Sequence, residues 1–114
     1  MKEIKAIIQP FMLVKVINAL KQIPHMPGVT VSKIQGFGRS RAEDTENSVN
    51  EWGILFVNKV KLETVVSDDM AEQIVETIQT NSHTGNIGDG KIFVLNLEEV
   101  VRIRTNETGK VAIG

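Results

Sequence analysis

Residues 55–78 read LFVNKVKLETVVSDDMAEQIVETI, and this stretch decides the fold. In its first half the alternate residues are mostly apolar, a period typical of a β-strand with one buried face. Ser67, Asp68 and Asp69 then suit the start of a helix, because serine can cap it and carboxylates favour its positive end. The apolar residues that follow recur at helical spacing: Met70, Ile74, Val75 and Ile78. The stretch therefore predicts a long strand over Leu55–Val66, followed by a helix.

A similar unit occupies the first 35 residues. Residues 4–9 form a short apolar run that Pro10 ends, and residues 29–35 are rich in β-branched side chains, so both indicate strands. Between them, apolar residues again follow helical spacing until two prolines and a glycine end the helix. These residues are Leu13, Val16, Ile17, Leu20 and Ile23, then Pro24, Pro27 and Gly28.

After residue 78 the chain adds a glycine-rich loop, 84–90, and a final predicted strand, 92–97. The predicted order is β-α-β-β-α-β. This is the ferredoxin-like α+β sandwich, in which two helices cover one face of a four-stranded antiparallel sheet. Apolar residues remain for the other face, so we expect it to pack against further subunits. The length of 114 residues fits a single domain over 1–114.

The composition argues against several classes of protein. A net charge of −1 and a single tryptophan give neither a basic surface nor an aromatic platform for nucleic acid. No apolar run reaches about 18 residues, so direct membrane insertion is not expected. The absence of cysteine and of an N-terminal apolar core favours a cytoplasmic location. The two histidines, His25 and His83, are far apart and predict no metal site.

Residues 37–53 read FGRSRAEDTENSVNEWG and interrupt the pattern between the second and third predicted strands. They contain almost no aliphatic residues and no periodicity. Long structureless loops inside a compact domain are usually functional or disordered. We interpret the segment as a mobile arm that meets a partner; a solvated loop without function is the alternative.

The segment 85–91, GNIGDGK, satisfies most of the phosphate-binding P-loop pattern. However, Ile92 stands where a Mg²⁺-binding serine or threonine is needed, and a predicted strand follows where a helix should begin. What remains is a glycine loop whose backbone N–H groups can converge on an anion, with Lys91 adding a positive charge. The alternative is a tight turn with a surface lysine.

Three arginines extend this hypothesis. The stretch 36–39, GFGR, fails as a dinucleotide motif but places Arg39 at a flexible strand end. Arg102 and Arg104 alternate, so in an extended chain both guanidinium groups face one side and suit phosphate oxygens; a solvated pair is the alternative. With Lys91, these arginines match the charge of a nucleoside triphosphate. The sequence offers no nucleophile–base pair, so the predicted chemistry is holding phosphates rather than cleaving them.

Five segments of the chain resemble the PII signal-transduction family. They read KAIIQPF (5–11), TVSKIQGFGR (30–39), KVKLETVV (59–66), TGNIGDGKIFV (84–94) and RIRTNETG (102–109). The resemblance implies a homotrimer that binds ATP or ADP, with Mg²⁺ accompanying ATP, in clefts between subunits. The nucleotide-site residues that it implies are Thr30, Gly36, Gly38, Arg39, Val65, Gly88, Asp89, Gly90, Lys91, Arg102 and Arg104.

The same resemblance makes 37–53 the loop that contacts a target, either a membrane transporter or a metabolic enzyme. Its expected contact residues are Ser40, Arg41, Asn50 and Trp52. Trp52 stands where many members carry a nucleotidylated tyrosine, and Asn50 where some carry a phosphorylated serine. Ser40 replaces the glutamine that binds Mg²⁺ in 2-oxoglutarate complexes, whereas Lys59, which pairs with that ligand, is retained. We therefore expect an energy sensor that binds 2-oxoglutarate weakly or not at all.

The predicted function is nucleotide-dependent regulation of transport or of nitrogen metabolism, and not catalysis. A small nucleotide-hydrolysing enzyme on the same fold is the alternative. An ATP-turnover assay separates the two.

Overall fold

The computed structural model describes residues 1–37, 48–49 and 55–114. The elements in chain order are β1 (Lys2–Ile8), the 3-10 helix η1 (Pro10–Met12), α1 (Leu13–Leu20), β2 (Thr30–Gly36), β3 (Ser48–Val49), β4 (Leu55–Val66), α2 (Asp68–Ser82), β5 (Gly90–Asn96) and the 3-10 helix η3 (Gly109–Ala112). Within these ranges, neither α-helix is long and apolar enough to cross a membrane. Both predicted β-α-β units are present.

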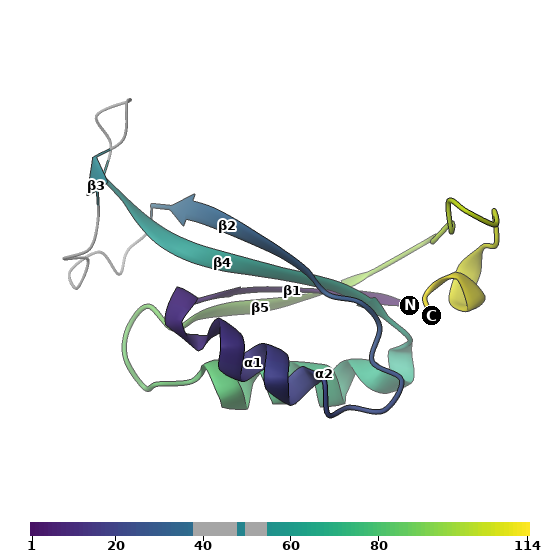
Figure 1. The fold of residues 1–114 in the computed structure, drawn as a ribbon, viewed down its shortest axis with the longest axis horizontal. Coiled ribbons are helices and arrows are strands. Elements are labelled where there is room, and N and C mark those ends of the chain that lie inside the picture. Colours follow the sequence, from purple (N-terminus) through teal and green to yellow (C-terminus); the bar gives the residue numbers. More distant parts are fainter. Residues whose placement is uncertain (38–47, 50–54) are drawn as a thin grey trace.

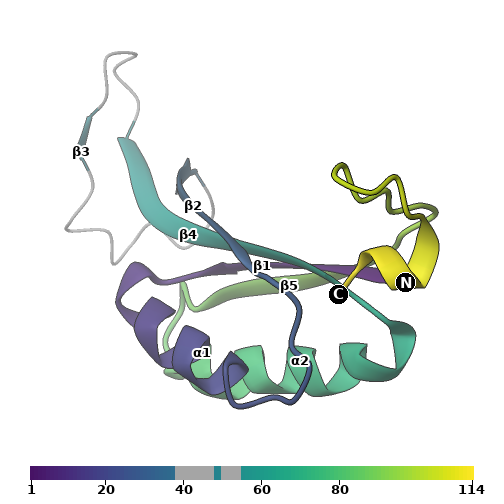
Figure 2. The ribbon, with the colours of Figure 1, turned by 45° about the vertical axis from the view of Figure 1, so that its right-hand side comes forward.

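Four strands form an antiparallel sheet in the order β2-β4-β1-β5, and α1 and α2 lie side by side on one of its faces (Figure 1). A view turned by 45° shows the same helical layer against the sheet (Figure 2). The predicted ferredoxin-like sandwich is thus confirmed. The short β3 pairs with the beginning of β4, so the segment 37–53, which we predicted to lack regular structure, contains a two-residue strand.

The core lies between the sheet and the helices, as the period of two along the strands predicts. Its most buried apolar residues are Ile4, Ala6, Ile8, Val16, Leu20, Val60, Leu62, Val66, Ile74 and Ile78. Thr64 is the polar member of this face; it is buried, and its Oγ1 donates a 2.9 Å hydrogen bond to the Gly28 carbonyl oxygen. A buried hydroxyl without a partner is costly, so this bond stabilises the buried position of Thr64. It also holds the turn before β2 against β4.

The predicted boundaries of α1 and β5 are wrong by up to three residues, and those of β1 and β2 by one or two. α1 ends at Leu20, and Ile23 is buried through a turn in which its N–H donates to the Leu20 carbonyl oxygen. β5 begins at Gly90, two residues earlier than predicted, because Gly90 pairs with Ile8 of β1. A Cβ at Gly90 would lie 1.7 Å from the Ile7 carbonyl oxygen, so this approach of two strands requires glycine.

The face of the sheet turned away from the helices carries both charged and apolar side chains. Phe93 and Leu95 of β5 lie on this face and are exposed. After β5, residues 100–109 form a turn that we call the C-terminal hairpin, which is closed by a bridge between Val101 and Thr108. The hairpin and the helix η3 project beyond one end of the sheet (Figure 1).

Candidate functional site

One end of the sheet, which we call the pocket end, holds a pocket of about 430 Å³ beside the C-terminal hairpin. Thr30 and Val65, both predicted to hold the nucleoside, line this pocket. Glu63 lines it too and pairs with Thr30 between β2 and β4. Other lining residues are Glu3, Gly28, Val100 and Ile113. The structure therefore brings the two predicted nucleoside residues into one cavity.

The opposite end of the sheet carries the glycine loop, residues 84–90. Gly90 pairs there with Ile8, whereas at the pocket end Val65 pairs with Glu3. Glu3 and Ile8 are five residues apart along β1, which corresponds to about 17 Å in an extended strand. Gly36, the last residue of β2, also lies at the glycine-loop end. The predicted nucleoside-binding residues and the glycine loop of one chain are therefore at opposite ends of its sheet, whereas Arg102 and Arg104 lie on the hairpin beside the pocket.

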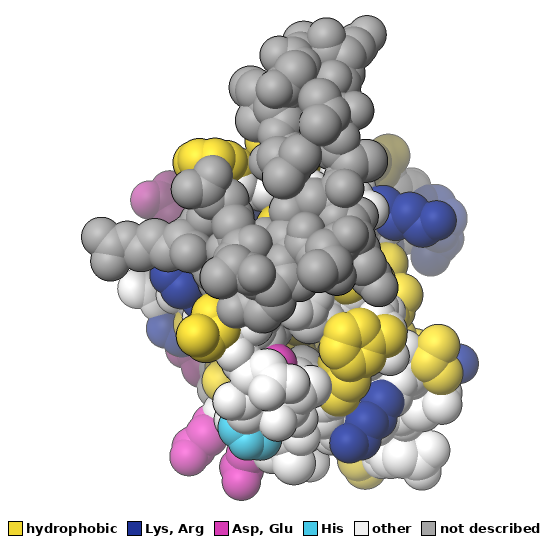
Figure 3. Space-filling view, turned by 90° about the vertical axis from the view of Figure 1, so that its left-hand side faces the viewer, with side chains coloured by type: hydrophobic (Ala, Val, Ile, Leu, Met, Phe, Trp, Pro, Cys, Tyr) yellow, Lys and Arg dark blue, Asp and Glu magenta, His cyan; other side chains and the backbone are white. Residues whose placement is uncertain are grey.

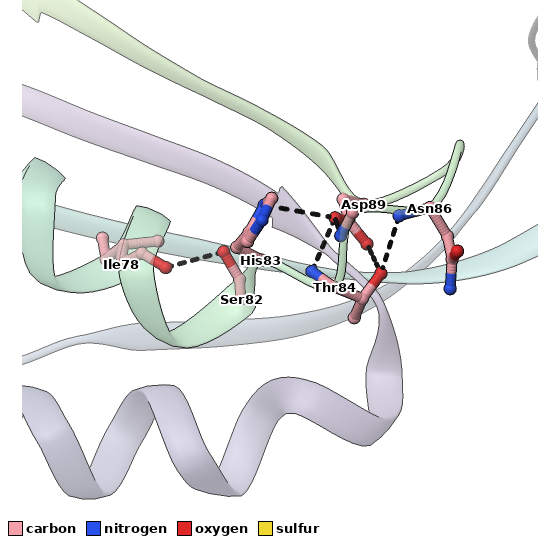
Figure 4. A network of polar contacts seen from close by, with 7 residues as sticks. Ile78, Ser82, His83, Thr84, Asn86 and Asp89 are labelled. Atoms are coloured by element: carbon pink, nitrogen blue, oxygen red, sulfur yellow. Dashed lines mark hydrogen bonds and ion pairs between the residues drawn. The ribbon is translucent and has the colours of Figure 1, made fainter.

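The carboxylate of Asp89 organises the glycine loop (Figure 4). It accepts hydrogen bonds from the N–H of Thr84 at 2.7 Å, from the N–H of Gly85 at 3.0 Å and from the Thr84 hydroxyl. The Thr84 Oγ1 accepts in turn from the N–H of Asn86 at 3.1 Å. His83 Nδ1 lies 3.9 Å from the same carboxylate. One side chain thus closes the loop on itself.

These contacts also set the charge of Asp89. Burial on its own would raise the pKa of this carboxyl, but the hydrogen bonds from Thr84 and Gly85 outweigh it and lower the pKa below its ordinary value. The carboxylate is therefore ionised at neutral pH, and donors of the loop itself surround its negative charge.

The same bonds divide the backbone N–H groups of the loop into two sets. Those of Thr84, Gly85 and Asn86 have acceptors within the loop. Those of residues 87 and 88 form no hydrogen bond within the described parts of the chain. Gly85, Gly88 and Gly90 have positive φ angles of 89°, 100° and 107°, which glycine adopts without strain. Adjacent uncommitted N–H groups form anion-binding concavities, so the loop can hold an anion beside the exposed Lys91.

Lys59 connects the glycine loop to β4. Its Nζ donates a 2.5 Å hydrogen bond to the Gly88 carbonyl oxygen across the end of the sheet. The resemblance implied that Lys59 pairs with 2-oxoglutarate. In this structure one of the three N–H donors of its ammonium group is already used by the loop.

The C-terminal hairpin differs from the arrangement predicted for Arg102 and Arg104. The chain turns over residues 103–105, with the Asn106 N–H bonded to the Arg102 carbonyl oxygen at 2.8 Å. The expectation of an extended chain with both guanidinium groups on one side is therefore wrong. The turn forms because Asn106 adopts a left-handed φ of 60°, which asparagine tolerates better than most residues.

Arg102 is committed to the hairpin and to the segment that follows it. Its Nη1 donates to Glu107 Oε1 at 2.7 Å. Its Nη2 donates to the carbonyl oxygens of Val111 at 3.0 Å and Gly114 at 2.6 Å. Arg104, by contrast, is exposed. In one chain, then, Arg104 is the freer of the two cations.

Six predicted residues, Gly38, Arg39, Ser40, Arg41, Asn50 and Trp52, lie outside the described residues. The sequence reasoning also missed two residues of the observed arrangement. Glu63 could have been found, because it shares an alternating strand face with Val65. Thr84 carries no such signal, since its contacts depend on how the loop folds back on itself.

Outside the residues drawn in grey, the surface at the glycine-loop end shows apolar, basic and acidic side chains and a histidine (Figure 3). Ile87 is 69% exposed on the loop, and Phe11 and Val14 are exposed where α1 begins. In the described ranges of the chain, no group of three or more histidine, cysteine or acidic side chains could hold a metal ion. The described part of this end is thus suited to contacts with an anion or with another protein surface.

The chain is similar to known regulatory proteins over nearly its whole length. A family model described as nitrogen regulatory protein P-II matches residues 1–107. The nitrogen regulatory protein P-II of Rhizobium meliloti (strain 1021) is 48% identical over 113 residues, which is 99% of this chain and 100% of that protein. The protein of the same name from Pyropia yezoensis is 48% identical over 107 residues, which is 94% of this chain and 95% of that protein.

A solved structure gives the same answer. Arabidopsis thaliana PII bound to citrate matches with a TM-score of 0.78 and 42% sequence identity, over 97% of this chain and 90% of that one. The similarity extends over the pocket, the glycine loop and the C-terminal hairpin alike. This chain belongs to the nitrogen regulatory protein P-II family of signal-transduction regulators.

Proposed function

We propose that the protein is a cytoplasmic energy sensor that binds ATP or ADP between neighbouring copies of its chain. The separation of the two half-sites carries the proposal: the pocket and the glycine loop of one chain lie about 17 Å apart along β1. Each chain thus presents a nucleoside surface at one end and a phosphate surface at the other. A head-to-tail neighbour brings the pocket of one chain to the glycine loop of the next.

The pocket suits a nucleoside. Its volume of about 430 Å³ is in the range of small-molecule sites. Val65 and Ile113 supply apolar wall against which a base can pack, and the Thr30 hydroxyl and Glu63 carboxylate supply hydrogen-bonding groups. A carboxylate accepts hydrogen bonds, so Glu63 matches the donors of a nucleoside, which are its hydroxyl and amino groups.

The glycine loop suits phosphate oxygens. The N–H groups of residues 87 and 88 are uncommitted in the described structure, and the exposed Lys91 adds a positive charge. In the proposed assembly, Arg104 comes from the neighbouring chain and Arg39 completes the cationic site. Charge-assisted hydrogen bonds of this kind are roughly twice as strong as neutral ones.

The edge strand β5 supports association between copies. Its three consecutive residues Phe93, Val94 and Leu95 are 43%, 49% and 42% exposed, and Ile103 on the hairpin is fully exposed. Natural sheet edges with long apolar stretches are usually covered, because they otherwise aggregate. A head-to-tail interface covers such an edge in every copy and can close into a ring, in accord with the homotrimer that the family resemblance implies.

Residues 37–53 are the output element in this proposal, and their target is a membrane transporter or a metabolic enzyme. The nucleotide, rather than 2-oxoglutarate, is the signal. Ser40 is shorter than the glutamine that completes the Mg²⁺ shell in related sites, and Lys59 is already bonded to Gly88. Titration of 2-oxoglutarate into protein saturated with Mg²⁺-ATP is therefore expected to release little heat.

Mixed oligomers test the shared site directly. Calorimetry should detect ATP and ADP binding to the wild-type protein, and Lys91→Ala and Arg104→Ala should each weaken it. When the two variants are co-expressed in equal amounts, about a quarter of the interfaces should combine an intact glycine loop with an intact Arg104 from its neighbour. Recovery of tight sites in that fraction supports a site between copies.

Four results would overturn the proposal. A site built within one chain gives no recovery on mixing, and light scattering would show a monomer if copies do not associate. Turnover of ATP at rates typical of enzymes would favour the hydrolase instead. The absence of any ATP or ADP binding to the wild-type protein would remove the nucleotide altogether.

A further inference from the structure

The glycine loop contains a closed set of hydrogen bonds that uses no ligand. Thr84 is the centre of this set, because its Oγ1 donates to Asp89 and accepts from the Asn86 N–H at 3.1 Å. Its own N–H donates to the second oxygen of the same carboxylate at 2.7 Å. Thr84 is exposed, so its side chain contributes to the loop through these bonds and not through burial.

The set determines which N–H groups remain for a ligand. The first three N–H groups of the loop are directed at Asp89 or Thr84, and those of residues 87 and 88 are left over. Lys59 of β4 contacts the same part of the loop, because its ammonium group donates a hydrogen bond to the Gly88 carbonyl oxygen. The Gly88 carbonyl group therefore faces this lysine. The orientation of the uncommitted N–H groups is therefore fixed from two sides before any anion arrives.

The set also controls a negative charge that would otherwise oppose phosphate binding. Asp89 lies directly before Gly90 and Lys91, and a free carboxylate there would repel an anionic ligand. In this structure the carboxylate instead accepts three hydrogen bonds from residues 84 and 85 (Figure 4). Asp89 was predicted to bind the nucleotide, whereas its contacts assign it to the loop.

We propose that Thr84 and Asp89 are positioning residues, which hold the N–H groups of residues 87 and 88 in place for phosphate oxygens without touching the ligand themselves. This inference rests on the proposed binding of ATP or ADP. It predicts that the Thr84 hydroxyl affects affinity for the phosphates and not for the nucleoside.

Isosteric variants of Thr84 test the inference. Thr84→Val removes the hydroxyl and keeps the shape, so ATP affinity should fall about tenfold, the effect of losing one hydrogen bond to a charged group. Thr84→Ser keeps the hydroxyl and should bind ATP within about twofold of wild type. Thr80→Val, an exposed threonine of α2, is the matched control and should leave affinity unchanged. Adenosine, which lacks phosphates, should compete equally well in all four proteins.

Asp89→Asn gives a second, independent test. The amide removes the negative charge beside the phosphates yet accepts fewer hydrogen bonds, so positioning predicts weaker ATP binding. Unchanged or tighter binding would overturn the role of Asp89, because the carboxylate would then only repel. The amide NMR signals of Gly85 and Asn86 should shift in both Asp89→Asn and Thr84→Val, but not in Thr80→Val.

The outcomes separate the two proposals. If wild-type protein binds ATP and Thr84→Val binds it equally well, the positioning role is wrong and the nucleotide function stands. Equal losses of ATP and adenosine affinity would mean that the change acts on the whole fold, which also contradicts positioning. If wild-type protein binds neither ATP nor ADP, the proposed function and the positioning role both fail.

Discussion

The glycine loop and the C-terminal hairpin are each organised by one charged side chain. Asp89 accepts three hydrogen bonds from residues 84 and 85, and Arg102 donates three to Glu107, Val111 and Gly114. Both residues were predicted to serve the phosphates of a nucleotide. In both cases the contacts within the chain point first to a structural role.

The two regions differ in what their central residue leaves available. Asp89 accepts hydrogen bonds from N–H groups at the start of the loop, and the N–H groups of residues 87 and 88 have no acceptor among the described residues. Arg102 consumes its own guanidinium donors, so it gives a positive charge to the hairpin and little reach beyond it. A charged residue in a predicted binding motif can therefore serve the local fold first, and its hydrogen bonds show which donors remain for a ligand.

The largest effect on stability is expected from Gly90→Ala, because Gly90 joins the glycine loop to β1 by pairing with Ile8. The new Cβ would lie 1.7 Å from the Ile7 carbonyl oxygen, and the residue has a φ of 107°. Overpacking and left-handed strain each cost about 1–3 kcal/mol, so the free energy of unfolding should fall by at least about 2 kcal/mol. Thermal and urea unfolding measure this loss.

Gly36→Ala is the matched control for that change. Gly36 is the last residue of β2 and also lies at the glycine-loop end of the sheet, but a Cβ there would meet nothing within 4 Å. Its unfolding free energy should stay within about 0.5 kcal/mol of wild type. Equal destabilisation by both variants would show that the pairing of Gly90 with Ile8 does not anchor the loop.

Arg104→Ala sharpens the comparison by removing the freer cation of the hairpin. Within the proposed function, ATP affinity should fall about ten- to hundredfold, because a charge-assisted contact to phosphate is lost. Stability should change little, since Arg104 is exposed. Calorimetry and thermal unfolding of the same preparation measure both quantities, and unchanged affinity would exclude Arg104 from the site.

Arg102→Ala should show the opposite balance. Removal of the three guanidinium hydrogen bonds should loosen the hairpin and lower stability by about 1–2 kcal/mol, a value reduced for partial exposure. Amide exchange at Asn106, whose N–H bonds to the Arg102 carbonyl oxygen, should accelerate in the absence of any nucleotide. If exchange there were unchanged and only affinity fell, Arg102 would be a ligand contact after all.

Much of the fold could be predicted from the sequence, because burial imposes periods that residues reveal. Alternation along Leu55–Val66 placed β4 to the residue, and the stripe through Ile74 and Ile78 placed α2. The start of β5 was missed because it depends on the contact of Gly90 with Ile7, which has no local pattern. The end of α1 was missed because a buried Ile23 continues the helical spacing past the last helical turn.

The site was predictable in its residue types but not in their roles. Spacing identified Lys91 and the glycines, and register then placed Thr30 beside Glu63. The turn at the left-handed Asn106 separated Arg102 from Arg104, and no period reports such a turn in an irregular segment. The roles proposed for Asp89 and Thr84 follow only from hydrogen bonds within the folded loop, which no sequence period reports.

The smallest effect is expected from acid, which should loosen the glycine loop more than the hairpin. Asp89 has a pKa below its ordinary value of 3.8, so its contribution is complete above that pH and is lost as the pH falls through the lowered value. Glu107, whose pKa the Thr105 hydroxyl and Arg102 lower from 4.5, follows the same sign. Protonation of Asp89 releases the N–H groups of Thr84 and Gly85.

The hairpin should respond less, because two of the three hydrogen bonds that Arg102 donates go to backbone carbonyl oxygens, which do not titrate. Its bonds to the carbonyl oxygens of Val111 and Gly114 therefore survive when Glu107 is protonated. Amide NMR shifts recorded from pH 5 down to pH 2.5 should move most at Thr84 and Gly85, and less at Asn106. A larger change at Asn106 would mean that Glu107, and not Arg102, holds the hairpin, and the parallel between the two central residues would then be wrong.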